Sequence, residues 1–187
     1  IKGLLAKLPA EGYLPVSLEP SEWEAVVGDP ETRKAMKAKA LAKAQTEARA
    51  AMAKNWIAEN GVLTGAADGG TIGSAKNYEN FELILDWKTE GEAEMGIRSI
   101  PQIALGGKNS GALTGNMLHD NAAPKAAANG PQEWNTMQVK VVSDRVTVVL
   151  NGVTTAENVI LENACNREIP AYAEGQILLI AGNAPLN

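Results

Sequence analysis

The chain has 187 residues, 45% of them hydrophobic and 21% charged, with a formal net charge of −5 at pH 7. This length and composition are typical of one globular domain with an ordinary core. The negative charge disfavours nucleic acid as the main partner, and no stretch reaches the roughly 20 apolar residues that span a bilayer. Cys165 is the only cysteine, which excludes an internal disulfide and a cysteine-based zinc site.

Residues 1–28 contain one short alternating apolar run, from Gly12 to Leu18. We expect an extended segment or an edge strand there, because Pro15 lacks the amide that a central strand needs. We treat residues 1–54 as an N-terminal extension and residues 55–187 as the main domain, within a single structural unit.

Residues 30–54 are predicted to form one α-helix. Asp29 suits the N-cap and Pro30 suits the first helical position. Residues 31–54 contain no glycine or proline that would interrupt the helix. A narrow apolar stripe recurs every four residues and should pack the helix on the outside of the domain: Met36, Ala40, Ala44, Ala48 and Met52. Seven of the 17 basic residues also lie here. They form either a solvated helix face or a basic docking face.

Residues 55–187 have the alternation of β-strands. The clearest runs are Phe81–Trp87, Thr136–Val142, Val146–Leu150 and Gln176–Ile180, and Asn151-Gly152 is a strong turn signal. Many short strands between turn residues indicate an all-β antiparallel sandwich or barrel. The side chains that should fill its core are Phe81, Leu83, Leu85, Trp134, Met137, Val139, Val141, Val148, Ile177 and Leu179.

Generic catalytic motifs are missing from the sequence, which has no phosphate-binding glycine loop, no metal-binding histidine motif and no nucleophile elbow. Polar residues instead gather around the long segment 106–130, and such groups suit the hydroxyls of a sugar. The candidate substrate-binding residues are Arg98, Gln102, Asn109 and Asn116. Arg98 and Gln102 should face the same side of a regular strand.

A general base is available in His119, the only histidine, or in Glu133, and the sequence does not choose between them. Each candidate has a plainer interpretation. Arg98 could form a surface salt bridge, His119 could be incidental in its loop, and Glu133 could be an ordinary surface residue. No metal ligand set is predicted, and no cofactor or oligomeric state follows from the sequence.

Several landmarks occur in a recognisable order. Gly96-Ile97-Arg98 precedes Glu133-Trp134-Asn135, which precedes Leu150-Asn151-Gly152 and then Gly175-Gln176-Ile177. From about Trp56 to the end, the chain resembles the 3-keto-disaccharide hydrolase family, formerly a domain of unknown function. The resemblance implies a concanavalin A-like jelly roll, so we expect such a sandwich with one added N-terminal helix.

The same resemblance implies hydrolysis or elimination-type cleavage of glycosides oxidised at C3. Such chemistry needs an acid–base group and a group that stabilises an enolate, for which a metal is one option. It also implies a carbohydrate ligand and a secreted or periplasmic protein, including a lipoprotein anchored through a removed N-terminus.

Two departures from the family pattern keep other functions open. Ala104-Leu105-Gly106 stands where the family often has a carboxylate, and Ile180-Ala181-Gly182 stands where it has a histidine. One alternative is therefore a non-catalytic carbohydrate-binding module of a secreted or envelope protein. Another is a structural domain of an envelope assembly, because fold does not fix function.

Overall fold

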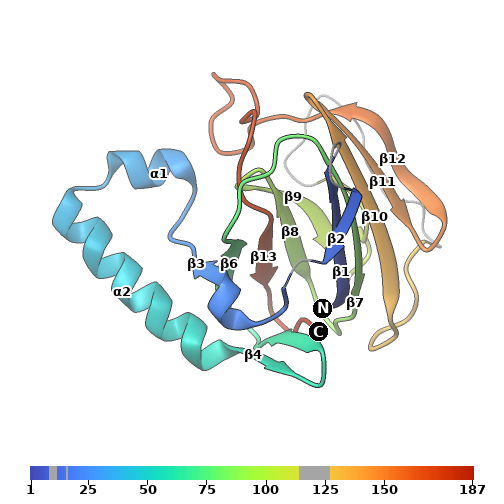
Figure 1. Ribbon diagram of the computed structural model, residues 1–187, viewed down its shortest axis with the longest axis horizontal. Coiled ribbons are helices and arrows are strands. Elements are labelled where there is room, and N and C mark those ends of the chain that lie inside the picture. Colours follow the sequence, from blue (N-terminus) through green and yellow to red (C-terminus); the bar gives the residue numbers. More distant parts are fainter. Residues whose placement is uncertain (9–11, 16, 114–126) are drawn as a thin grey trace.

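Two antiparallel sheets stack face to face into a jelly-roll sandwich in the computed structural model, which describes residues 1–8, 12–15, 17–113 and 127–187 (Figure 1). The predicted fold class is confirmed. The six-stranded sheet has, in spatial order, β12 (Val153–Ile160), β11 (Arg145–Leu150), β10 (Asn135–Val142), β7 (Phe81–Trp87), β1 (Lys2–Leu8) and β2 (Gly12–Pro15). The five-stranded sheet has β3 (Trp23–Ala25), β6 (Gly70–Ser74), β13 (Leu178–Ala181), β8 (Ala93–Ile97) and β9 (Ile100–Leu105). A hairpin of β4 (Trp56–Glu59) and β5 (Val62–Gly65) lies beside them.

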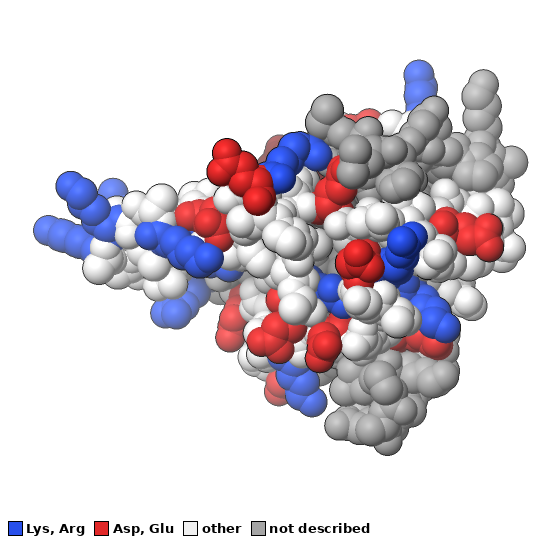
Figure 2. Space-filling model, turned by 90° about the horizontal axis from the view of Figure 1, so that it is seen from above, with Lys and Arg blue, Asp and Glu red and all other residues white. Residues whose placement is uncertain are grey.

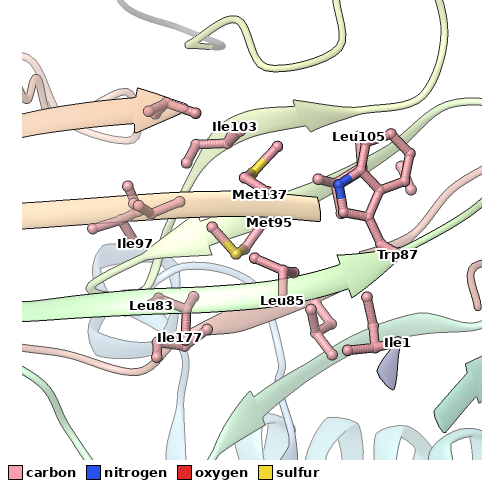
Figure 3. Close-up of a cluster of buried hydrophobic side chains, with 14 of the residues drawn as sticks. Ile1, Leu83, Leu85, Trp87, Met95, Ile97, Ile103, Leu105, Met137 and Ile177 are labelled. Carbon is pink, nitrogen blue, oxygen red and sulfur yellow. The ribbon is translucent and has the colours of Figure 1, made fainter. Parts of the chain in front are cut away.

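The core lies between the two sheets and is filled by alternate residues of each strand, as the period of a strand requires. Figure 3 shows Leu83 and Leu85 of the six-stranded sheet in one cluster with Met95 and Ile103 of the five-stranded sheet. Apart from Trp134, every side chain predicted for the core is buried.

Trp134 is the exception, because it is only half-buried. The first residue of β10 is Asn135, and it is the Asn135 side chain that turns inward, with 2% of its surface exposed. The Trp134 ring instead lies under two ammonium groups, with its centre 4.2 Å from Nζ of Lys2 and 5.2 Å from Nζ of Lys88. Cation–π contacts thus replace the predicted core packing.

The strands described within residues 1–25 belong to both sheets. β1 pairs with β7 on one side and with β2 on the other, so β2, which contains Pro15, is the edge strand. β3 forms the edge of the five-stranded sheet and follows the short 3-10 turn Pro20–Glu22. The run predicted to hold an edge strand thus contains β2, whereas the central strand β1 was not predicted.

The predicted helix is two helices, α1 (Pro30–Ala35) and α2 (Ala38–Asn55), separated by the two extended residues Met36 and Lys37. No glycine or proline marks this break. Asp29 caps α1 as predicted, because its carboxylate accepts hydrogen bonds from the amides of Glu31 and Thr32. We call residues 29–55 the arm: it projects from the sandwich beside β3 and β6 and carries many of the lysines and arginines (Figures 1 and 2). Neither helix is long and apolar enough to cross a membrane.

Candidate functional site

One line of residues crosses the outer face of the five-stranded sheet, the face turned away from the core. Ile180 of β13 pairs with Thr71 of β6 on one side and with Glu94 of β8 on the other. Glu94 in turn pairs with Ala104 of β9, and the amide of Val26, just after β3, donates to the Thr71 carbonyl. Directly paired residues share a face. We call these five residues the cross-strand row.

A pocket of about 360 Å³ opens at one end of this row, where β8 begins and where β9 and β13 end. We call it the carboxylate pocket. Two carboxylates and two amides supply its polar groups, and backbone or small side chains supply most of the rest. Its lining is Glu92, Ala93, Glu94, Ala104, Gly106, Asn109, Ile180, Gly182 and Asn183.

The pocket depends on very close approaches of backbone segments. A Cβ atom placed on Gly182 would lie 1.7 Å from the carbonyl oxygen of Glu92, and one on Gly106 would lie 2.0 Å from that of Gly91. Only glycine fits where two backbones come so close. The three strand ends are therefore drawn together at residues without side chains, and this brings the polar side chains around them into one place.

Glu94 lies in β8, and Glu92 is the residue just before that strand. Both glutamates line the pocket. Extended backbone separates the Cα atoms of residues two positions apart by about 7 Å. A Cβ on Gly107 would lie 3.1 Å from Cγ of Glu92, so the Glu92 side chain runs along that loop. Glu94 is half-buried between Ile180 and Ala104. Two carboxylates in one pocket are suited to acid–base chemistry.

Asn183 joins this pair through the backbone of Glu92. Its Oδ1 accepts a hydrogen bond from the Glu92 amide at 2.9 Å. Because the oxygen is held in this way, the Nδ2 group of Asn183 has a set direction and can donate to a ligand. The pocket thus combines two carboxylates that can accept protons with one oriented amide donor, a set that suits a ligand rich in hydroxyl and carbonyl oxygens.

Asn109 is the predicted site residue that lines this pocket. Gln102 lies in β9, but its side chain is outside the described part of the structure, and Asn116 and His119 lie outside the described residues altogether. Glu133 is exposed in the turn before β10, where its Oε2 accepts a hydrogen bond from the Gly130 amide at 3.1 Å. Glu133 does not line the carboxylate pocket.

Arg98 has a structural position that the sequence does not reveal. With Ser99 it forms the two-residue turn between β8 and β9, and both residues have positive φ, +51° and +69°. Only 3% of Arg98 is exposed. Its Nε donates to the Glu79 carbonyl at 2.9 Å and its Nη1 to the Tyr172 carbonyl at 3.2 Å. Burial lowers the pKa of the Arg98 guanidinium, which these carbonyls hold.

These bonds occupy Arg98 in joining three segments of the chain, and the residue does not line the carboxylate pocket. Backbone carbonyls of Glu79 and Tyr172 are therefore the partners of Arg98, in place of a surface carboxylate. These bonds give Arg98 a structural role, and its role in binding a sugar stays a prediction.

Glu92, Glu94 and Asn183 are the pocket residues that sequence reasoning missed. A signal existed for the two glutamates: the stretch Glu92-Ala93-Glu94-Met95 alternates acidic and apolar residues, which is the pattern of a strand with an acidic outer face. Asn183 carries no such signal. Among the residues that the structure describes, no group of three or more His, Cys, Asp or Glu side chains is placed to hold a metal ion.

Together the fold and the pocket define a jelly-roll domain that presents a polar, sugar-sized pocket on the outer face of one sheet. The sequence matches the model of the 3-keto-alpha-glucoside-1,2-lyase-like domain over residues 21–187, and the chain belongs to that family. The match begins well before Trp56 and so includes most of the predicted N-terminal extension, residues 1–54. A search of curated proteins found no significant match.

Solved structures of similar fold include three proteins from Parabacteroides distasonis ATCC 8503, each provisionally described as a glycosyl hydrolase. One is 22% identical with a TM-score of 0.54, and the alignment covers 71% of this chain and 86% of that one. Another is 15% identical with a TM-score of 0.59 and covers 100% of this chain and 91% of that one. At these identities the likeness establishes the fold.

Proposed function

We propose that this protein cleaves glycosides that are oxidised to a ketone at C3 of the sugar, and that it does so by β-elimination in the carboxylate pocket. The observation that carries the proposal is that Glu94 of β8 and Glu92, just before that strand, line one pocket in a member of the 3-keto-alpha-glucoside-1,2-lyase-like family.

The chemistry starts from the acidity that the C3 ketone gives to the proton on C2. A carboxylate removes that proton, the electron pair forms the C1–C2 double bond, and the bond from C1 to the aglycone oxygen breaks. The departing oxygen gains a proton, which balances the one lost from C2. Addition of water to the unsaturated sugar would complete a net hydrolysis.

We assign the base to Glu94, because it lies deeper in the pocket between Ile180 and Ala104. Glu92 is more exposed, at the mouth of the pocket, and donates the proton that the departing oxygen gains. The Nδ2 group of Asn183 supplies a donor for the oxygen of the enolate, since its own oxygen is held by the Glu92 amide. Asn109, on the loop that follows β9, binds hydroxyls of the sugar.

The test is cleavage of 3-keto-disaccharides, followed by product analysis, for the parent and for Glu94→Gln and Glu92→Gln. Loss of a general acid or base should lower kcat by on the order of 100-fold to 10,000-fold. Substrate deuterated at C2 should react more slowly in the parent, because the C2–H bond breaks in the elimination.

Glu90→Gln is the matched control, since Glu90 is an exposed acid two residues before Glu92 and does not line the carboxylate pocket. Its rate should equal that of the parent. Full activity of Glu94→Gln would refute the assignment of the base. A parent that binds these sugars but cleaves none of them would favour the alternative function, a carbohydrate-binding module.

A further inference from the structure

A second cavity lies on the same face of the five-stranded sheet, under the arm. Its volume is about 400 Å³, and five planar or charged polar side chains line it: Glu24, Arg33, Gln45, Asn77 and Gln176. We call it the arm pocket. Arg33 comes from α1, Gln45 from α2 and Glu24 from β3, so the arm and the sheet edge build it together.

Three of the five polar groups of the arm pocket, those of Glu24, Arg33 and Gln176, are held by hydrogen bonds within the protein. The Gln176 amide donates from Nε2 to Oε2 of Glu24 and to the carbonyl of Ser74, both at 2.9 Å. Arg33 Nη1 donates to the Gly28 carbonyl at 2.7 Å, which fixes the direction of its remaining guanidinium donors. A Cβ on Gly73 would lie 2.9 Å from Cδ of Gln176, so the floor leaves room for that amide.

The two pockets are neighbours along the cross-strand row. Val26 lines the arm pocket, while Ile180, Glu94 and Ala104 line the carboxylate pocket, and Thr71 alone stands between Val26 and Ile180 in the row. Val26 and Glu94 are separated by three strand spacings, or about 14 Å. A glycan that occupies both pockets must therefore extend over more than one sugar ring.

From this geometry we propose that the arm pocket is a second subsite for a neutral, hydroxyl-rich sugar unit of the same substrate. The proposal rests on the proposed function and adds its substrate class, which is an oligosaccharide or a glycan end longer than a disaccharide. Amide, carboxylate and guanidinium groups pair with adjacent hydroxyls of a sugar. The methyl groups of Val26, Thr71 and Ile180 offer a surface to the C–H face of a sugar ring. The two charged side chains of the pocket, Glu24 and Arg33, carry opposite signs, a balance that favours a neutral glycan over an anionic one.

The test is calorimetric binding of unoxidised gluco-oligosaccharides, from disaccharide to pentasaccharide, to the whole protein. Affinity should rise with chain length in the parent, and the rise should disappear in Arg33→Gln, with a loss of about tenfold for the longest ligand. Lys34→Gln is the matched control, since it removes the same charge from the next residue of α1, which is exposed and does not line the pocket.

Gln45→Ala is a second variant that keeps a good helix former in α2 and should also weaken the longest ligand. Affinity that does not depend on length, or that is unchanged in both Arg33→Gln and Gln45→Ala, would overturn the proposal. Cleavage of 3-keto-disaccharides without length-dependent binding would refute this subsite alone. Length-dependent binding lost in Arg33→Gln, without any cleavage, would refute only the proposed catalysis.

Discussion

Asn183 holds the backbone amide of Glu92 at 2.9 Å across 91 residues of sequence. The bond ties the end of β13 to the start of β8, and it gives Asn183 two separable tasks. Its oxygen supports the backbone beside the catalytic candidates, and its NH₂ group is left to donate to a ligand in the pocket that Asn183 lines.

Asn183→Asp separates these tasks. The carboxylate still accepts from the Glu92 amide, but the donor is lost and a third negative charge enters the pocket. We expect kcat on a 3-keto-disaccharide to fall about 100-fold, as on loss of an oxyanion donor, while the free energy of unfolding stays within about 0.5 kcal/mol of the parent. Denaturant titration and steady-state kinetics measure the two effects. Asn183→Ala removes both tasks and should lower stability as well, and a fully active Asn183→Asp would exclude the donor role.

Arg98→Ala should destabilise the protein by about 3 kcal/mol or more, because buried carbonyls of Glu79 and Tyr172 lose their charged partner. Urea denaturation measures this change. Sugar affinity of the folded fraction should remain that of the parent. If the variant keeps parental stability but loses sugar binding, the binding role predicted from the sequence holds and the structural role does not.

Leu83 and Val139 face each other as Cα partners in β7 and β10, and each is 1% exposed. Leu83→Ala and Val139→Ala should each cost about 2–4 kcal/mol. Because the two side chains are direct neighbours, the double variant should not show the sum of the two losses. Val142→Ala, on the same strand but 51% exposed, is the control and should change stability by less than about 0.5 kcal/mol. A large loss of stability in Val142→Ala would mean that burial does not determine how much each truncation destabilises the protein.

Gly106→Ala and Gly152→Ala compare a steric clash with backbone strain alone. Both glycines have positive φ, +78° and +81°, but a Cβ on Gly106 meets the Gly91 carbonyl whereas one on Gly152 meets nothing within 4 Å. Gly152→Ala should cost about 1–2 kcal/mol, the strain of a left-handed residue. Gly106→Ala should cost more and should also lower activity, because it deforms the carboxylate pocket. Thermal unfolding and steady-state kinetics measure these effects. Equal losses of stability and of activity in the two variants would contradict the close approach at Gly106.

Asp29 should make the capping of α1 depend on pH. Burial by itself raises the pKa of Asp29, but hydrogen bonds from Thr32 and from the backbone outweigh it and hold the pKa below its ordinary value. A carboxyl with a lowered folded-state pKa adds stability above its unfolded pKa, and that stability is lost as the pH falls through the folded value. Asp29→Ala should cost about 1 kcal/mol of helix stability at neutral pH.

Amide hydrogen exchange of residues 31–35 measures this effect. Asp29→Asn keeps a capping oxygen without a titrating group, so its protection should not change between neutral and acidic pH. Protection that falls equally with acid in the parent and in Asp29→Asn would remove Asp29 as the cause.

The sequence by itself determined the class of fold and most of the core. A strand alternates its side chains with a period of two, so the patterns at Phe81–Trp87 and Thr136–Val142 specify which residues face inward. It also determined the cap at Asp29, which is a local interaction between neighbours in the chain. Trp134 does not follow the predicted pattern, because a shift of one residue at the start of β10 reverses the face of a side chain.

Only the tertiary structure decided the site. Glu92, Gly106 and Gly182 come from three strand ends that meet because β13, β8 and β9 are neighbours in the sheet, an order that local patterns do not encode. The same is true of Arg98, whose partners at Glu79 and Tyr172 are 19 and 74 residues away. A sequence pattern shows which side chains can hydrogen-bond, but the fold alone shows whether a backbone carbonyl or an open pocket stands in front of them.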